Sequence, residues 1–113
     1  MKKSNILEDI KYNDDKVAIS VLFETDFTKE IRIVFKKDQK MNKHQTPFPI
    51  TVALVSGELD FGVGNDKHKL KQGDIVSLDG GVPHDLFAKT NCIVRLTLSK
   101  QDKVERVNKV INS

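Results

Sequence analysis

The sequence predicts an all-β domain, a sandwich or a barrel of short antiparallel strands. Hydrophobic and polar residues alternate with a period of two in at least five short segments. Glycine, asparagine and aspartate separate these segments, and no long stretch with helical periodicity lies between them. The length of 113 residues is typical of one domain with a single hydrophobic core.

The first two strands are expected in KVAISVLFE, residues 16–24, and EIRIVFK, residues 30–36. Because side chains alternate across a strand, each segment places one apolar set on a single face. These sets are Val17, Ile19, Val21 and Phe23 in the first strand, and Ile31, Ile33 and Phe35 in the second.

The next strands are expected in ITVALVSGELDFGV, residues 50–63, which turns at Gly57. DIVSL, residues 74–78, and CIVRLTL, residues 92–98, complete the pattern. The apolar positions expected in the core are Val52, Leu54, Leu59, Phe61, Val63, Val94, Leu96 and Leu98. Several of these strands are apolar on both faces, so the second face packs either on another sheet of the same chain or on a second copy, and we expect a homodimer.

The two ends of the chain differ from this pattern. Residues 1–14 are expected to form an N-terminal extension and residues 15–100 the β-domain. In the tail, residues 101–113, Val104, Val107, Val110 and Ile111 recur at helical spacing. The tail is therefore predicted to be helical or irregular.

Charge and cysteine content exclude several classes of function. The net charge is +3, but the lysines are scattered among acidic residues and form no basic run with aromatic residues, so we expect no nucleic-acid binding. Cys92 is the only cysteine, which excludes an internal disulfide and a paired-cysteine metal site. No apolar segment resembles a secretory signal or reaches membrane-spanning length. We therefore expect a cytoplasmic protein that binds no membrane.

Two segments carry a recognisable spacing. The second of them, GDIVSLDGGVPHDLFA at residues 73–88, resembles the cupin motif G-x5-P-x-G-x2-H-x3-N. Gly73, Gly81 and His84 occupy the corresponding positions, whereas Asp79 replaces the proline and Ala88 the asparagine. Asp85 follows His84 directly, so on a regular strand it faces the opposite side.

The first segment, MNKHQTPFPITVALVSGELDF at residues 41–61, resembles the other cupin motif, G-x5-H-x-H-x3–4-E-x6-G. Counting back from Gly57 places Ile50 at the glutamate, Thr46 at the second histidine and His44 at the first, with Asp38 at the opening glycine. A second register makes His44 the second histidine, with Asn42 first and Pro49 or Phe48 at the acid. It fits the distance to Gly57 less well.

The resemblance covers about residues 15–100 and implies an RmlC-like cupin, a jelly-roll β-barrel of two antiparallel sheets that is often dimeric. In that family three histidines and one glutamate hold iron, manganese, nickel or zinc. Only His44 and His84 of that set stand in this sequence, so they are the candidate ligands of a divalent metal.

The function expected from this pattern is binding of a small organic molecule in the barrel, with or without a divalent metal. The candidate binding residues are His44, Thr46, Phe48, Ile50 and His84, with Phe48 either covering the cavity or filling the core. The alternative is a metal-dependent dioxygenase, isomerase or lyase that acts on a small polar substrate. Purely structural histidines, hydrogen-bonded to backbone or water, are the third interpretation.

Overall fold

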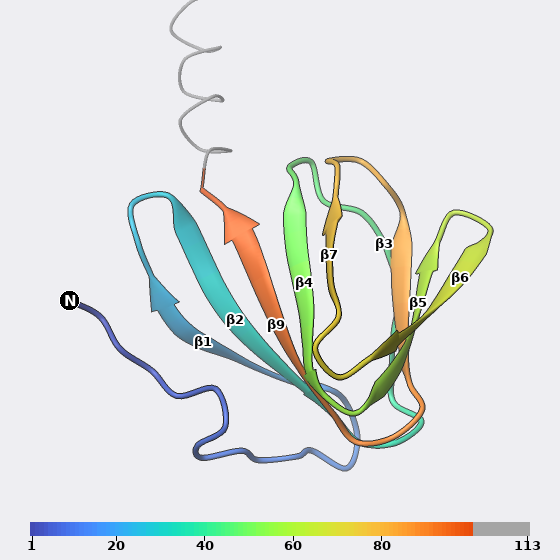
Figure 1. Cartoon of the computed structure of the whole chain (residues 1–113), viewed down its shortest axis with the longest axis horizontal. Helices are drawn as coiled ribbons and strands as arrows, with labels where there is room; N and C mark the ends of the chain where they lie inside the picture. The colour runs from blue at the N-terminus through green and yellow to red at the C-terminus, as the bar shows by residue number, and fades with distance from the viewer. Residues whose placement is uncertain (101–113) are drawn as a thin grey trace, which may run out of the picture.

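The computed structural model describes residues 1–100, and the predicted tail lies outside the described residues (Figure 1). The described part contains nine strands and no helix. They are β1 Ala18–Glu24, β2 Thr28–Phe35, β3 Lys40–His44, β4 Ile50–Ser56, β5 Glu58–Val63, β6 Asp66–Lys71, β7 Ile75–Leu78, β8 His84–Ala88 and β9 Cys92–Ser99. Within residues 1–100, no helix long and apolar enough to cross a membrane is present.

The strands form two antiparallel sheets (Figure 1). One sheet has five strands in the order β1-β2-β9-β4-β7, and the other has four in the order β3-β8-β5-β6. Strands far apart in the chain, such as β2 and β9 or β3 and β8, are direct neighbours. This interleaving is that of a jelly roll, so the predicted all-β architecture is confirmed.

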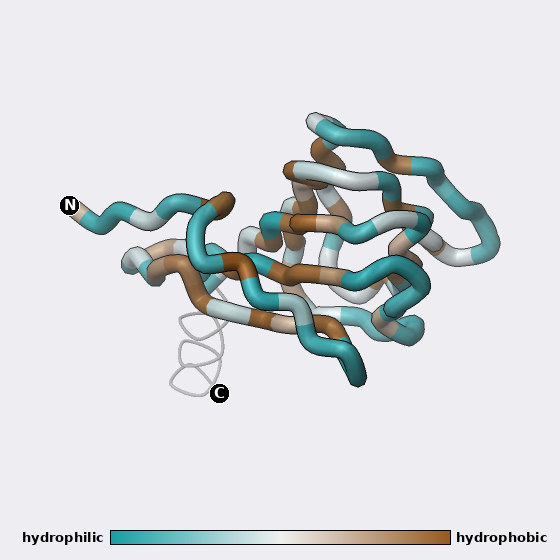
Figure 2. Tube along the Cα trace, turned by 90° about the horizontal axis from the view of Figure 1, so that it is seen from below, coloured by the Kyte–Doolittle hydropathy of each residue, from teal (hydrophilic) through white to brown (hydrophobic). Residues whose placement is uncertain are grey.

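The core lies between the sheets and is built mainly from the alternating sets expected in the central strands. Figure 2 shows hydrophobic stretches along the strands and hydrophilic residues at many of the turns. The buried cluster includes Ile31, Ile33, Phe35, Val52, Leu54, Leu59, Phe61 and Val94. Cys92 is fully buried beside them, and burial raises the pKa of its thiol, so it is not poised as a nucleophile.

The first strand departs from its predicted alternation. A bulge between Val21 and Phe23 shifts the register, so Phe23 pairs with Glu30 instead of continuing the face of Ile19 and Val21. The prediction of one face for all four apolar residues was therefore wrong. Because β1 is the edge strand of the five-stranded sheet, Ile19 and Val21 remain 58% and 51% exposed.

Two backbone positions match the turns that the motifs require. Gly57 between β4 and β5 has φ of +98°, and a Cβ there would overlap with the carbonyl oxygen of Asn91. Asp38, which stands at the opening glycine of the first motif, has φ of +73°. Asp38 thus adopts the left-handed conformation that glycine favours, which supports the register with His44 first.

The N-terminal segment is held against the outer face of the five-stranded sheet by Arg32 of β2. Its guanidinium donates hydrogen bonds to the carbonyl oxygens of Ile6, Glu8 and Asp9, at 3.1, 2.6 and 3.3 Å. Charge-assisted bonds of this kind are stronger than neutral ones. This face of the sheet is therefore partly covered by the chain itself.

Candidate ligand-binding site between the sheets

His44 and His84 meet at the mouth of the core. They are direct partners across the β3–β8 pair, and their ring centroids lie 4.3 Å apart with planes tilted by 58°. His84 is only 3% exposed, whereas His44 is half-buried. The ring of His84 also stacks on Phe61, with centroids 5.8 Å apart and an angle of 19°.

A bulge in β3 brings His44 to this position. Met41 pairs with Leu86 and His44 with His84, so three steps along β3 match two steps along β8. With regular alternation Lys43 would stand opposite His84 and His44 would face outward. The extra residue turns His44 inward and leaves Lys43 outside.

Both imidazoles are oriented by the same local contact. Nδ1 of His44 lies 2.7 Å from the carbonyl oxygen of Asn42, and Nδ1 of His84 lies 3.0 Å from that of Val82. A carbonyl oxygen only accepts, so each Nδ1 carries the proton and donates. In the neutral rings both Nε2 atoms therefore keep a free lone pair, the arrangement that lets a histidine accept a hydrogen bond or bind a metal.

The free space beside the two rings is small. A cavity of about 20 Å³ is lined by Ile33, Met41, His44, Ile50, Val52, His84, Leu86, Val94 and Leu96. That volume is about enough for one water molecule. The interior of the barrel is thus filled by its own apolar side chains, and a larger ligand has to enter from the half-open side at His44.

The loop between β3 and β4 lies next to this cavity without lining it. Its two prolines keep residues 45–49 out of the ladder, as expected at a barrel edge. Thr46 and Phe48 border a separate hollow of about 200 Å³, and Ile50 borders both. The structure therefore brings together His44, His84 and Ile50, and it places Thr46 and Phe48 beside them in the neighbouring hollow.

The glycine turn before His84 holds that loop in place. The backbone N–H of Gly81 donates to the carbonyl oxygen of Thr46 at 2.7 Å. A Cβ at Gly80 would overlap with the backbone of Pro47. The glycine pair therefore lets the turn approach the loop closely, which positions the start of β8 and with it His84.

The described donor set does not fit a resident catalytic metal. Among residues 1–100 no group of three or more histidine, cysteine or acidic side chains is arranged to hold an ion. The Thr46 hydroxyl donates to the carbonyl oxygen of Phe48 at 2.9 Å, and Ile50 is a buried hydrocarbon. Two imidazoles alone replace too little of the hydration shell of a divalent ion to fix it.

Six of the cavity residues are not among the predicted binding residues, namely Ile33, Met41, Val52, Leu86, Val94 and Leu96. Ile33 and Val94 belong to the alternating core pattern, so their burial was predictable from the sequence. Their place beside the histidines was not. Met41 reaches the cavity because it precedes the β3 bulge and shares a face with His44. Its flexible thioether side chain suits the irregular space beside two imidazoles.

Comparison with known proteins agrees with this architecture. A family model described as the cupin domain matches residues 32–99. An RmlC-like cupin from Desulfovibrio desulfuricans is 22% identical, with a TM-score of 0.81 over 88% of this chain and 96% of that chain. An RmlC-like cupin from Shewanella frigidimarina is 20% identical, with a TM-score of 0.74 over 88% and 91%.

KdgF from a Halomonas species is 15% identical, with a TM-score of 0.72 over 88% of this chain and 94% of that chain. At such identities the solved structures share the fold with this chain, and the likeness carries no activity. No curated protein matches the sequence. The interleaved sheets, the turn at Gly57 and the family match over more than half of the chain lead to one conclusion: this chain belongs to the cupin-domain family.

Proposed function

We propose that this cupin binds a small organic molecule at the pair His44 and His84. The observation that carries the proposal is the state of the two rings. Each donates Nδ1–H to a backbone carbonyl, so both Nε2 atoms remain available beside an apolar cavity. A mostly apolar site with a few oriented polar groups is the usual composition of a small-molecule site.

The geometry restricts the ligand. The unprotonated Nε2 of a neutral ring accepts a hydrogen bond, so a hydroxyl is the group of a ligand that matches it. Since the cavity holds about one water, the ligand places only one polar group between the rings. The rest of it contacts the half-open side near His44.

A metal-dependent dioxygenase, isomerase or lyase ranks second. The same two free Nε2 atoms favour it, because neutral imidazole is the commonest metal ligand in proteins. The described donor set argues against it, since it lacks the third and fourth side chains of the family pattern. Water or substrate would have to complete the coordination.

The test is a thermal-shift screen of the full chain against sugars, uronates and small carboxylates. A ligand that raises the midpoint for the parent protein should fail to do so for the His44→Ala/His84→Ala double variant. His68→Ala is the matched control, because His68 is an exposed histidine of β6 away from the pair. No shift with any compound, or an equal shift in the double variant, contradicts the proposal.

Metal content separates the two candidate functions. Protein prepared with added iron, manganese, nickel or zinc should contain no stoichiometric metal if the histidines bind an organic molecule directly. One ion per chain that disappears in the double variant would instead favour the enzyme. Elemental analysis of both proteins decides between these outcomes.

A further inference from the structure

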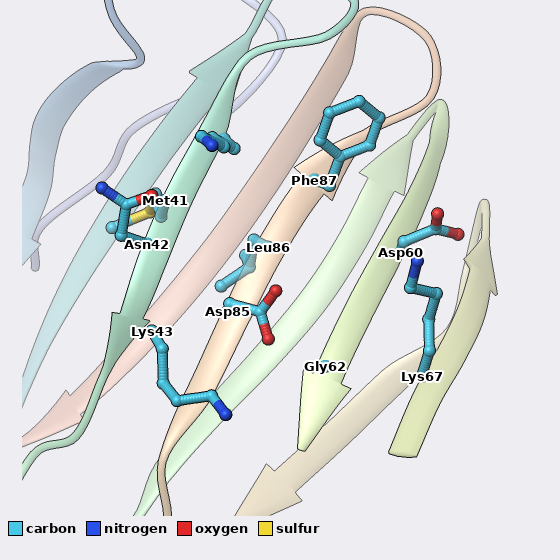
Figure 3. Close-up of a pocket in the computed structure, with 10 residues that line it drawn as sticks. Met41, Asn42, Lys43, Asp60, Gly62, Lys67, Asp85, Leu86 and Phe87 are labelled. Atoms are coloured by element: carbon cyan, nitrogen blue, oxygen red, sulfur yellow. The ribbon is translucent and has the colours of Figure 1, made fainter. Parts of the chain in front are cut away.

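A second hollow lies on the opposite side of the β3–β8 pair from the histidines. It is a groove of about 360 Å³ on the outer face of the four-stranded sheet, lined by residues of β3, β5, β6 and β8 (Figure 3). This volume falls in the range of small-molecule sites, unlike the cavity between the sheets. None of the histidines lines it.

The floor of the groove is created by Gly62 of β5. Gly62 pairs with Asp85 across the β5–β8 ladder, and Asp60 pairs with Phe87 two residues along on the same face. A Cβ at Gly62 would overlap with the carboxylate of Asp85, so this side chain lies across the glycine. Only glycine leaves room for it, and the missing side chain provides the depth of the groove.

Two carboxylates in the groove have no donor of their own. Asp60 is only 8% exposed, yet within residues 1–100 its side chain accepts no hydrogen bond and forms no ion pair. Asp85 is half-buried and likewise lacks a partner in that range. A carboxylate only accepts hydrogen bonds, so neither aspartate can donate to a ligand in the groove. A ligand that fits here therefore brings hydrogen-bond donors.

The rim of the groove carries the opposite charge. Lys40 and Lys43 line it from β3 and Lys67 from β6. Figure 3 shows Asp85 between Lys43 and Lys67, and Asp60 on the side of Lys67. An anion would lie against the two carboxylates, and a cation would lie against the three lysines. The charges nearly cancel, which favours a neutral ligand that both donates and accepts hydrogen bonds.

We propose that this groove binds a neutral carbohydrate. Sugar hydroxyls donate to Asp60 and Asp85 and accept from the lysines of the rim. The apolar C–H face of a sugar ring packs on the half-buried ring of Phe87, which lies in the groove beside Asp85. This site is separate from the histidine pair and does not depend on it.

The test is an amide NMR titration of the full chain with glucose, galactose, maltose and cellobiose. We expect saturable shifts at Asp60, Gly62 and Asp85 for at least one of these sugars. Asp60→Asn and Asp85→Asn should each weaken binding by about tenfold or more, the worth of one charge-assisted hydrogen bond. Asp66→Asn is the matched control, since Asp66 is an exposed aspartate at the start of β6 outside the groove.

The outcomes separate this proposal from the function of the histidines. The His44→Ala/His84→Ala variant should keep the sugar shifts. Absence of shifts with all four sugars overturns the proposal, as does equal binding by both aspartate variants. Stronger shifts at the same amides with inorganic phosphate or with calcium would overturn the neutral class. If Asp60→Asn does not fold, Asp85→Asn carries the test alone.

Discussion

His44 and His84 stand directly opposite each other on β3 and β8, with ring centroids 4.3 Å apart, although forty positions of chain separate them. The two are not equivalent. His84 is buried and stacked on Phe61, whereas His44 lies at the half-open side.

We therefore expect His84→Ala to lower the free energy of unfolding by about 2–3 kcal/mol, because it leaves a void beside Phe61. His44→Ala should cost less than about 1 kcal/mol, because its ring is partly solvated. Urea unfolding of both variants measures the difference. Equal losses would contradict the unequal packing of the two rings.

The turn at Gly57 offers a second test, because it combines backbone conformation with close approach. Gly57→Ala meets both a positive φ and the carbonyl oxygen of Asn91, so we expect a loss of about 2–4 kcal/mol. Gly73→Ala is the matched control: φ is +94° there, but no atom lies within 4 Å of the added Cβ. It should cost only about 1–2 kcal/mol. A comparable loss at both sites in thermal or urea unfolding would refute the close contact at Gly57.

The Glu30 carboxyl should make the free energy of unfolding depend on pH. Burial alone would raise its pKa, but Arg95 Nε at 2.9 Å and Thr97 Oγ1 at 2.7 Å donate to the carboxylate and lower the pKa below the usual 4.5. A carboxyl with a lowered folded-state pKa stabilises the fold above its unfolded pKa, and this contribution disappears as the pH falls through the folded value.

Glu30→Gln should therefore be less stable than the parent at neutral pH, by about 1 kcal/mol because Arg95 is half-exposed. The difference should shrink as the pH falls from neutral to about 3. Glu58→Gln is the control, since Glu58 is exposed at the start of β5 and its carboxylate forms no ion pair among residues 1–100. Urea unfolding across this pH range measures both variants, and a gap that stays constant for Glu30→Gln would contradict the assignment.

The predicted homodimer can be tested on β1. Ile19 and Val21 project from an edge strand and are more than half exposed, and such edges pair readily with a second chain. Val21→Lys should shift a dimer toward monomer in sedimentation equilibrium. Lys16→Glu, at an exposed position just before the strand, serves as a control for charge change. A parent protein that is monomeric at all concentrations would refute the homodimer.

Much of this fold was predictable because its signals are local. Ile31, Ile33 and Phe35 share one face of their strand and are buried as predicted, and Gly57 adopts the turn conformation that its spacing implied. The inward orientation of His84 after the glycine turn was also predictable, because strand alternation alone places His84 on the inner face and Asp85 on the outer face.

Other features depended on contacts between distant strands. The bulge after Val21 moved Phe23 to the other face, and the bulge in β3 turned His44 inward. A bulge is a property of two paired strands, so the period of one segment cannot reveal it. Likewise, the near absence of free space beside the histidines follows from how side chains of both sheets fill the volume.

The amino-acid sequence alone thus determines that short strands and tight turns follow one another in the order typical of a cupin. The reason is that hydrophobic periodicity and backbone preference act within a few residues. Tertiary structure decides what the site contains. It pairs His44 with His84, sets Thr46 and Phe48 in the neighbouring hollow, and joins Asp60, Gly62 and Asp85 in an outer groove. The physical reason is that register and packing between sheets involve residues far apart in the chain, and these assign each side chain its neighbours.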